Sequence, residues 1–84
     1  MNDYADNNGN SSVDKYQIGS DFIIVKFKDN KYSDIVFYRY TYASAGRGNI
    51  EEMKRLAQFG SGLSSYINKN KVQHSAKGTS LENV

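Results

Sequence analysis

The sequence predicts a small α+β domain, in which an antiparallel sheet of two to four strands packs against two short helices. Two observations predict the sheet and one predicts the helices. Residues 21–28 and 34–42 alternate as strands do, so that every second side chain shares a face. Apolar residues between 50 and 57 recur at helical spacing instead. A chain of 84 residues suffices for one domain with a small core.

The two ends of the chain are predicted to lie outside this domain. Residues 1–14 are rich in Asn, Asp and Ser, and such a segment buries too little surface to offset the entropy of ordering it. We therefore predict a disordered acidic arm over residues 1–14, a single binding domain over 15–77 and a flexible tail over 78–84. An ordered part of about sixty residues favours a homo-oligomer, a dimer or a dimer-based assembly, that completes the core.

Composition narrows the classes of function. The chain has no cysteine, which excludes a disulfide scaffold and a cysteine-type zinc site, and the single histidine, His74, cannot hold a metal alone. It has no run of eighteen apolar residues and no signal-peptide pattern at its start. We expect a cytoplasmic protein (host cytoplasm if a phage encodes it) with no cofactor, no metal and no membrane contact.

The positive charge is concentrated in the predicted domain. All eleven lysines and arginines lie between residues 15 and 77, where they face only five carboxylates, whereas residues 1–14 carry three aspartates and no base. A basic domain suits an anionic partner, and ordinary solubilising charge explains the pattern equally well.

The first strands can be placed from their flanking turns. Residues 15–18 are read as a short edge strand, and residues 21–28 as a strand whose odd-numbered side chains from 23 to 27 form a wholly apolar face for the core. Residues 29–31 form a turn, because Asp and Asn bond their own backbone.

The following strand, residues 34–42, carries more aromatic surface than a small core needs. Tyr38, Tyr40 and Tyr42 share one face, and Arg39 lies on the other. Either helices cover one face and a second subunit the other, or the aromatic face is a platform for a ligand.

Two helices complete the expected fold. Asn49 is a candidate N-cap with Glu52 three residues later, as in a capping box, and Gly60 ends this helix. Ser61 can cap a second, shorter helix that ends near Lys69.

Three segments resemble a known family. Val25-Lys-Phe27, Tyr38-Arg-Tyr40 and Ser65-Tyr-Ile-Asn68 are similar to the apolar strand, the Tyr-x-Tyr strand and the last helical segment of the KTSC domain, a small α+β module found at the C-terminus of some lysyl-tRNA synthetases. The resemblance covers about residues 21–70 and implies this fold and an association with nucleic acid. It transfers no catalytic site.

The chain departs from the family at two places. Residues 43–48 replace a short turn that contains proline, and Gly62 stands two residues before the position of the family glycine. Because of the inserted residues, the resemblance does not extend to the connection between the strand and the helix.

The strand-to-helix turn is the first candidate binding site. Gly46, Arg47, Gly48 and Asn49 precede a helix, where free N–H groups, the helix dipole and a guanidinium favour an anion. The alternative is a flexible loop whose glycines only allow the turn.

The aromatic strand is the second candidate. Tyr38, Tyr40 and Tyr42 can stack on nucleobases, or they can belong to the core or to a subunit interface. Arg39, a charge within an apolar strand, lies either at an edge or beside an anion. A possible phosphate rim, which can equally be a solvated face, comprises Lys54, Arg55, Lys69 and Lys71.

Catalysis finds little support. Glu51 and Glu52 point about 100° apart on a helix and cannot share a substrate. The serines have no partner histidine apart from His74, and no phosphate-binding loop, dinucleotide or zinc-protease motif is present. We predict that the protein is not an enzyme.

These observations favour a non-catalytic, oligomeric binding module for a phosphate-bearing nucleotide. Its size and charge resemble those of small phage proteins that act as sponges for cyclic nucleotide defence signals, an analogy only. The alternatives are an RNA- or DNA-binding module of KTSC type, and a protein-interaction inhibitor that uses the aromatic face.

Overall fold

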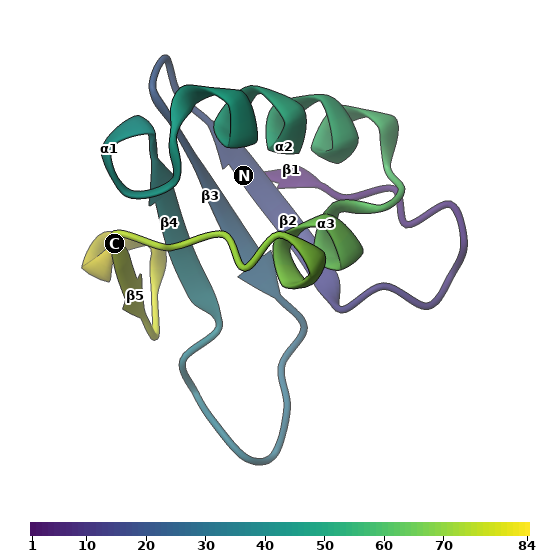
Figure 1. Ribbon diagram of the computed structural model, residues 1–84. Helices are drawn as coiled ribbons and strands as arrows, with labels where there is room; N and C mark the ends of the chain where they lie inside the picture. The colour runs from purple at the N-terminus through teal and green to yellow at the C-terminus, as the bar shows by residue number, and fades with distance from the viewer.

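Five strands form one antiparallel sheet in which neighbours along the chain are also neighbours in space (Figure 1). The computed structural model describes residues 1–84. The strands are β1 (Asn2–Asp3), β2 (Val13–Ile18), β3 (Phe22–Phe27), β4 (Phe37–Thr41) and β5 (Ala76–Gly78). The predicted α+β class is confirmed, with five strands in place of the two to four expected.

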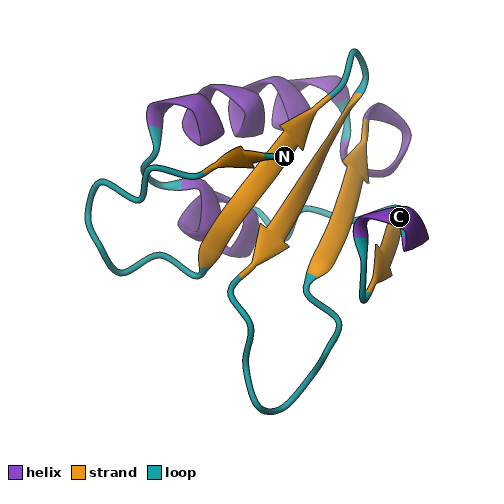
Figure 2. Cartoon of the chain, turned by 180° about the vertical axis from the view of Figure 1, so that it is seen from behind, coloured by secondary structure: helices purple, strands orange, loops and turns teal.

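The helices gather on one side of this sheet. They are α1 (Tyr42–Ala45), α2 (Arg47–Phe59) and α3 (Leu63–Lys69), and a 3-10 turn, η1 (Leu81–Asn83), follows β5. From behind, the strands lie in front of α2 and α3, so these two helices cover a single face (Figure 2). We call the other face the outer face. No helix of the chain is both long enough and apolar enough to cross a membrane.

The core lies between α2, α3 and the central strands. The predicted apolar face of β3 is confirmed, because Ile23 and Val25 are completely buried. The predicted stripe of α2 is confirmed as well, since Ile50 and Met53 are also completely buried. The buried cluster comprises Tyr4, Val13, Tyr16, Ile23, Val25, Tyr40, Ile50, Met53, Ala57, Leu63, Ile67 and Val72.

The start of α2 differs from the prediction that Asn49 caps it with Glu52. Gly46 is the N-cap, and its φ of +87° lets the chain turn directly from α1 into α2. Asn49 lies inside the helix, where its side chain donates to the carbonyl of Ala45 at 2.8 Å. The capping box of this region belongs to α1 and is formed by Thr41 and Ser44.

The junction of α2 and α3 is only partly as predicted. Gly60 ends α2 in the left-handed conformation, with a φ of +83°, as the sequence indicated. The N-cap of α3 is Gly62 and not Ser61, and no side chain caps this end. Two glycines with positive φ on either side of Ser61 place the chain in a tight corner that a serine cap does not fit.

Residues 1–14 are part of the fold, in contrast to the disordered arm that we predicted. β1 pairs with β2, and Tyr4 and Val13 are buried in the core. The amide of Asn7 donates to the carbonyl of Phe59 at 2.8 Å, and its backbone N–H donates to Gly60 at 2.8 Å. Asn7, which belongs to a segment predicted to be disordered, thus satisfies two carbonyls at the end of α2.

The β3–β4 connection is longer than the predicted turn. Strand β4 begins at Phe37, so the expected strand over 34–42 loses its first residues to the loop and Tyr42 to α1. The side-chain oxygen of Asn30 accepts the backbone N–H groups of Tyr32 and Ser33, which holds the loop in a turn. This loop projects beyond the end of the sheet (Figure 1).

Candidate functional site

A cleft of about 580 Å³ lies at the end of the sheet from which the β3–β4 loop projects. The segment after α3 crosses in front of β3 and β4 on its way to β5 and closes one side of this end (Figure 1). A hydrogen bond from the N–H of Ser75 to the carbonyl of Arg39 fixes the crossing segment to β4 at 2.7 Å. The cleft is lined by Phe27, Asn30, Ile35, Val36, Tyr38, Tyr40, Ile67, Asn68, Lys71, Val72, Gln73 and His74.

Aromatic rings form one wall of the cleft. Tyr38 meets Phe27 edge-on at 5.4 Å between ring centroids and meets His74 edge-on at 5.1 Å. Tyr40 stacks beside Tyr38 at 6.5 Å with 23° between the ring planes. Because neighbouring rings hold one another, this wall is formed before any ligand arrives.

The rest of the lining combines aliphatic and polar side chains and carries one charge. Lys71 is the only charged residue in the lining, and side-chain amides are contributed by Asn30, Asn68 and Gln73. The backbone of Lys71 has a φ of +49°, and the amide of Gln73 donates to its carbonyl at 3.0 Å. The lysine therefore projects from an ordered turn after α3.

Tyr40 lies at the base of the cleft with 3% of its surface exposed, and this burial raises the pKa of its hydroxyl. We predict that the Tyr40 hydroxyl stays protonated in the folded chain at a pH where a fully solvated tyrosine ionises. The unfolded chain loses that proton near pH 10 while the folded chain keeps it, so the free energy of unfolding should fall as the pH rises above about 10. Tyrosinate absorbance and urea unfolding at several alkaline pH values measure both effects, and Tyr40→Phe should flatten this part of the stability profile.

Tyr42 belongs to a different cluster, at the corner between α1 and α2. Its hydroxyl donates to Glu51 at 2.7 Å, and this bond raises the pKa of Tyr42 and lowers that of Glu51. The guanidinium of Arg47 and the amine of Lys54 lie 6.0 and 5.6 Å from the centre of its ring. Lys54 also pairs with Glu51 at 2.9 Å and donates to the carbonyl of Ser20 at 3.0 Å.

The glycine-arginine turn lines no cleft. Gly46 and Gly48 are exposed and have open space beside them. The amide of Asn49 is occupied, since it accepts from the hydroxyl of Tyr66 at 2.6 Å while donating to Ala45. Four residues were expected to hold an anion here, and Arg47 is the only charged one among them. Its guanidinium forms no ion pair with a carboxylate.

The remaining predicted residues are separated from the cleft. Arg39 lies on the outer face, as strand alternation predicted. Arg55 forms two hydrogen bonds to Glu52, at 2.8 and 2.6 Å, and Lys69 is exposed at the end of α3. The structure thus brings Tyr38, Tyr40 and the rim residue Lys71 together and distributes the others over four places: the α1–α2 corner, the outer face, the Arg55–Glu52 pair on α2 and the end of α3.

His74 is the functional candidate that sequence reasoning missed. Its ring faces both Tyr38 and Tyr40, the latter at 6.4 Å. The segment around it shows no strand or helix pattern, so no periodicity could place it over β4. The available signal was that the only histidine of the chain directly follows Gln73, close to Lys71.

No group of three or more His, Cys, Asp or Glu side chains is close enough to hold a metal ion. Comparison of the chain with models of protein families, with curated proteins and with solved structures found no match. The resemblance of residues 21–70 to the KTSC family therefore stays a prediction.

Proposed function

We propose that the protein is a non-catalytic binding module whose cleft holds a small planar ligand with an anionic group, such as a nucleotide. The observation that carries this proposal is the aromatic wall of Tyr38, Tyr40 and His74 in a cleft whose only charged lining residue is Lys71. A cleft of about 580 Å³ lies in the range of sites for small molecules.

Each part of the cleft suits one part of such a ligand. The accessible surface of Tyr38 and His74 offers contact to a planar ring, and a base stacked on an aromatic side chain contributes about 1–3 kcal/mol. At the edge of a base, the amide of Asn68 can donate and accept hydrogen bonds, the NH2 group of Asn30 can donate, and the side-chain oxygen of Gln73 can accept. Lys71 supplies a positive charge for a phosphate at the rim.

The lining also explains why we propose binding without turnover. It contains no carboxylate, no serine and no cysteine, so no nucleophile–base pair of the serine or cysteine type and no carboxylate pair can form with His74 in the cleft. A ligand would be held and released unchanged. Sequestration of a cyclic nucleotide requires only such reversible binding, and we include a role as a sponge for such a signal in the proposal. One protomer supplies all the lining residues, so self-association stays a separate prediction.

Affinity measurements on two pairs of variants test the proposal. A thermal-shift screen of linear nucleotides, cyclic nucleotides and short RNA and DNA should first find a ligand, since a ligand at 100 times its dissociation constant adds about 2.7 kcal/mol of stability. Tyr38→Leu should then weaken its binding about fivefold to a hundredfold through lost stacking. Lys71→Gln should weaken the binding of phosphorylated ligands more than that of the nucleosides.

Matched controls come from the chain itself. Lys69→Gln removes a neighbouring lysine outside the cleft, and Arg47→Ala removes the guanidinium of the α1–α2 corner; neither should change the affinity. If Arg47→Ala weakened ligand binding and Tyr38→Leu did not, the proposal that the ligand binds in the cleft would be wrong. The glycine-arginine turn would then be the binding site.

The same screen separates the alternatives. A nucleic-acid module would prefer long RNA or DNA and lose affinity steeply with salt, whereas an enclosed nucleotide depends on salt less. A protein-interaction module would show no stabilisation by any of these ligands, and that outcome would refute the proposal.

A further inference from the structure

Arg39 occupies an unusual place on the outer face of the sheet. It pairs with Ile24 across β3 and β4, and its guanidinium carbon lies 4.6 Å from the centre of the Phe22 ring. One terminal nitrogen, Nη1, donates to the main-chain oxygen of Val84 at 3.0 Å. The Nε atom is buried and has no hydrogen-bond partner.

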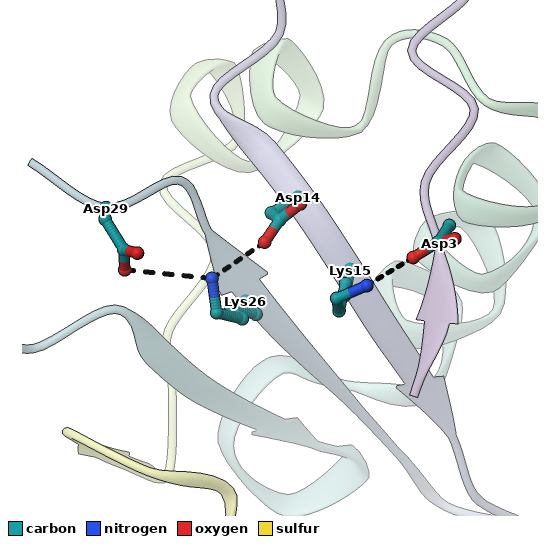
Figure 3. A network of polar contacts seen from close by, with 5 residues as sticks. All are labelled: Asp3, Asp14, Lys15, Lys26 and Asp29. Carbon is teal, nitrogen blue, oxygen red and sulfur yellow. Dashed lines mark hydrogen bonds and ion pairs between the residues drawn. The ribbon is translucent and has the colours of Figure 1, made fainter.

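The other basic side chains of the outer face are satisfied by carboxylates. Lys26 lies 2.7 Å from Asp14 and 3.8 Å from Asp29, and Lys15 pairs with Asp3 (Figure 3). Among the basic residues of β2, β3 and β4, Arg39 is therefore the one without a carboxylate side chain as partner. A buried guanidinium N–H without an acceptor is unfavourable. The Nε–H group of Arg39 can therefore still bind a hydrogen-bond acceptor.

The contact between Arg39 and Val84 depends on the C-terminal segment, residues 79–84. Strand β5 carries this segment past β4, and η1 folds back beside β5 (Figure 2). The return requires close packing at one glycine, because a Cβ atom on Gly78 would lie 2.8 Å from the Cβ of Asn83. Gly78 thus permits the segment to place Val84 against the guanidinium.

We infer that Arg39 is an oxyanion-binding site on the outer face, and that the C-terminal segment keeps it closed. The main-chain oxygen of Val84 takes the place of one oxygen of a phosphate or carboxylate group. When the segment moves away, Nε and the terminal nitrogens present the planar edge that binds such groups through two bonds. The Phe22 ring holds the guanidinium in position by a cation–π contact. The site is independent of the cleft, which lies on the opposite face.

A phosphate titration of the full chain, followed by NMR at constant ionic strength, tests this inference. The Arg39 Nε–Hε cross peak and the backbone amide of Val84 should shift together and saturate, because phosphate displaces the Val84 oxygen. Gly78→Ala forces the segment outward without touching Arg39. It should lower the dissociation constant for phosphate about tenfold, the worth of one competing hydrogen bond to a charged group.

Two further variants serve as controls. Adding Asn83→Gly to Gly78→Ala removes the Cβ at 2.8 Å and leaves the backbone oxygen of residue 83 at 3.3 Å, so it should move the dissociation constant most of the way back to the native value. Arg39→Lys keeps the charge and loses Nε, and it should abolish the saturable shifts of the Phe22 and Val84 amides. Equal dissociation constants in the native chain and a folded Gly78→Ala variant would overturn the inference. So would shifts that survive Arg39→Lys, or a native chain in which the Nε–Hε and Val84 signals do not move together.

Discussion

Replacing Tyr4 by alanine should lower the free energy of unfolding by about 3–5 kcal/mol, the range for truncating a large buried ring. Tyr4 keeps only 7% of its surface exposed and belongs to the core cluster beside Val13 and Tyr16. Its hydroxyl also accepts the backbone N–H of Leu63 at 3.3 Å, the first residue of α3. The substitution therefore opens a cavity between the N-terminal segment and the helix layer.

Such a loss would be a large part of the total stability. A chain of 84 residues has about 4–13 kcal/mol of unfolding free energy at ordinary values per residue. Urea unfolding followed by circular dichroism measures the change. Tyr4→Phe should cost only about 1–3 kcal/mol, for the N–H left without its acceptor. Tyr32→Ala, at a tyrosine that is 85% exposed, should cost less than about 0.5 kcal/mol. If Tyr4→Ala unfolded like Tyr32→Ala, residues 1–14 would be a free arm after all.

The central elements could be predicted because their local signals agree with the fold. The alternation of β3 and the helical spacing of Ile50 and Met53 are set by backbone geometry, so they correctly identified the buried faces. Gly60 ended α2 for an equally local reason, its access to the left-handed conformation.

The ends of the chain could not be predicted, because their order depends on distant partners. Asn7 and Asn8 are polar residues without periodicity, and they are fixed by hydrogen bonds to Phe59 and Ser61, more than fifty residues away. The tail is fixed in the same manner by its contact with Arg39. Composition indicates how much apolar surface a segment can bury. It does not show which distant polar groups the segment will bind through hydrogen bonds.

The candidate site could be predicted only in part, because some of its residues are placed by local patterns and others by the path of the chain. Alternation along β4 correctly put Tyr38 and Tyr40 on one face and Arg39 on the other, and this alone separates the arginine from the two tyrosines. Lys71 and His74 line the same cleft as the tyrosines because residues 70–75 cross the sheet, a path that no local pattern encodes. Most of the aromatic surface of residues 34–42 packs within one protomer, since Tyr40 is buried in the core and Tyr38 and Tyr42 pack against it.

Replacing Ile50 by alanine should lower the free energy of unfolding by about 2–5 kcal/mol and should make α2 melt together with the sheet. Ile50 is completely buried in the interface between α2 and the strands. The helix has little stability of its own, because no side chain caps its N-terminus and its first turn contains no acidic residue. A helix of thirteen residues with such an end depends on packing along its apolar stripe.

The same substitution at an exposed site isolates the contribution of burial. Ile35→Ala removes the same atoms from a residue that is 37% exposed, and it should cost less than about 1 kcal/mol. For Ile50→Ala, far-UV and near-UV circular dichroism should report one shared transition at a lower urea concentration, because the helix cannot persist without the core. A helical signal that outlasted the near-UV transition would show that α2 is stable without its contact to the sheet, and the account of how the core holds the fold would be wrong.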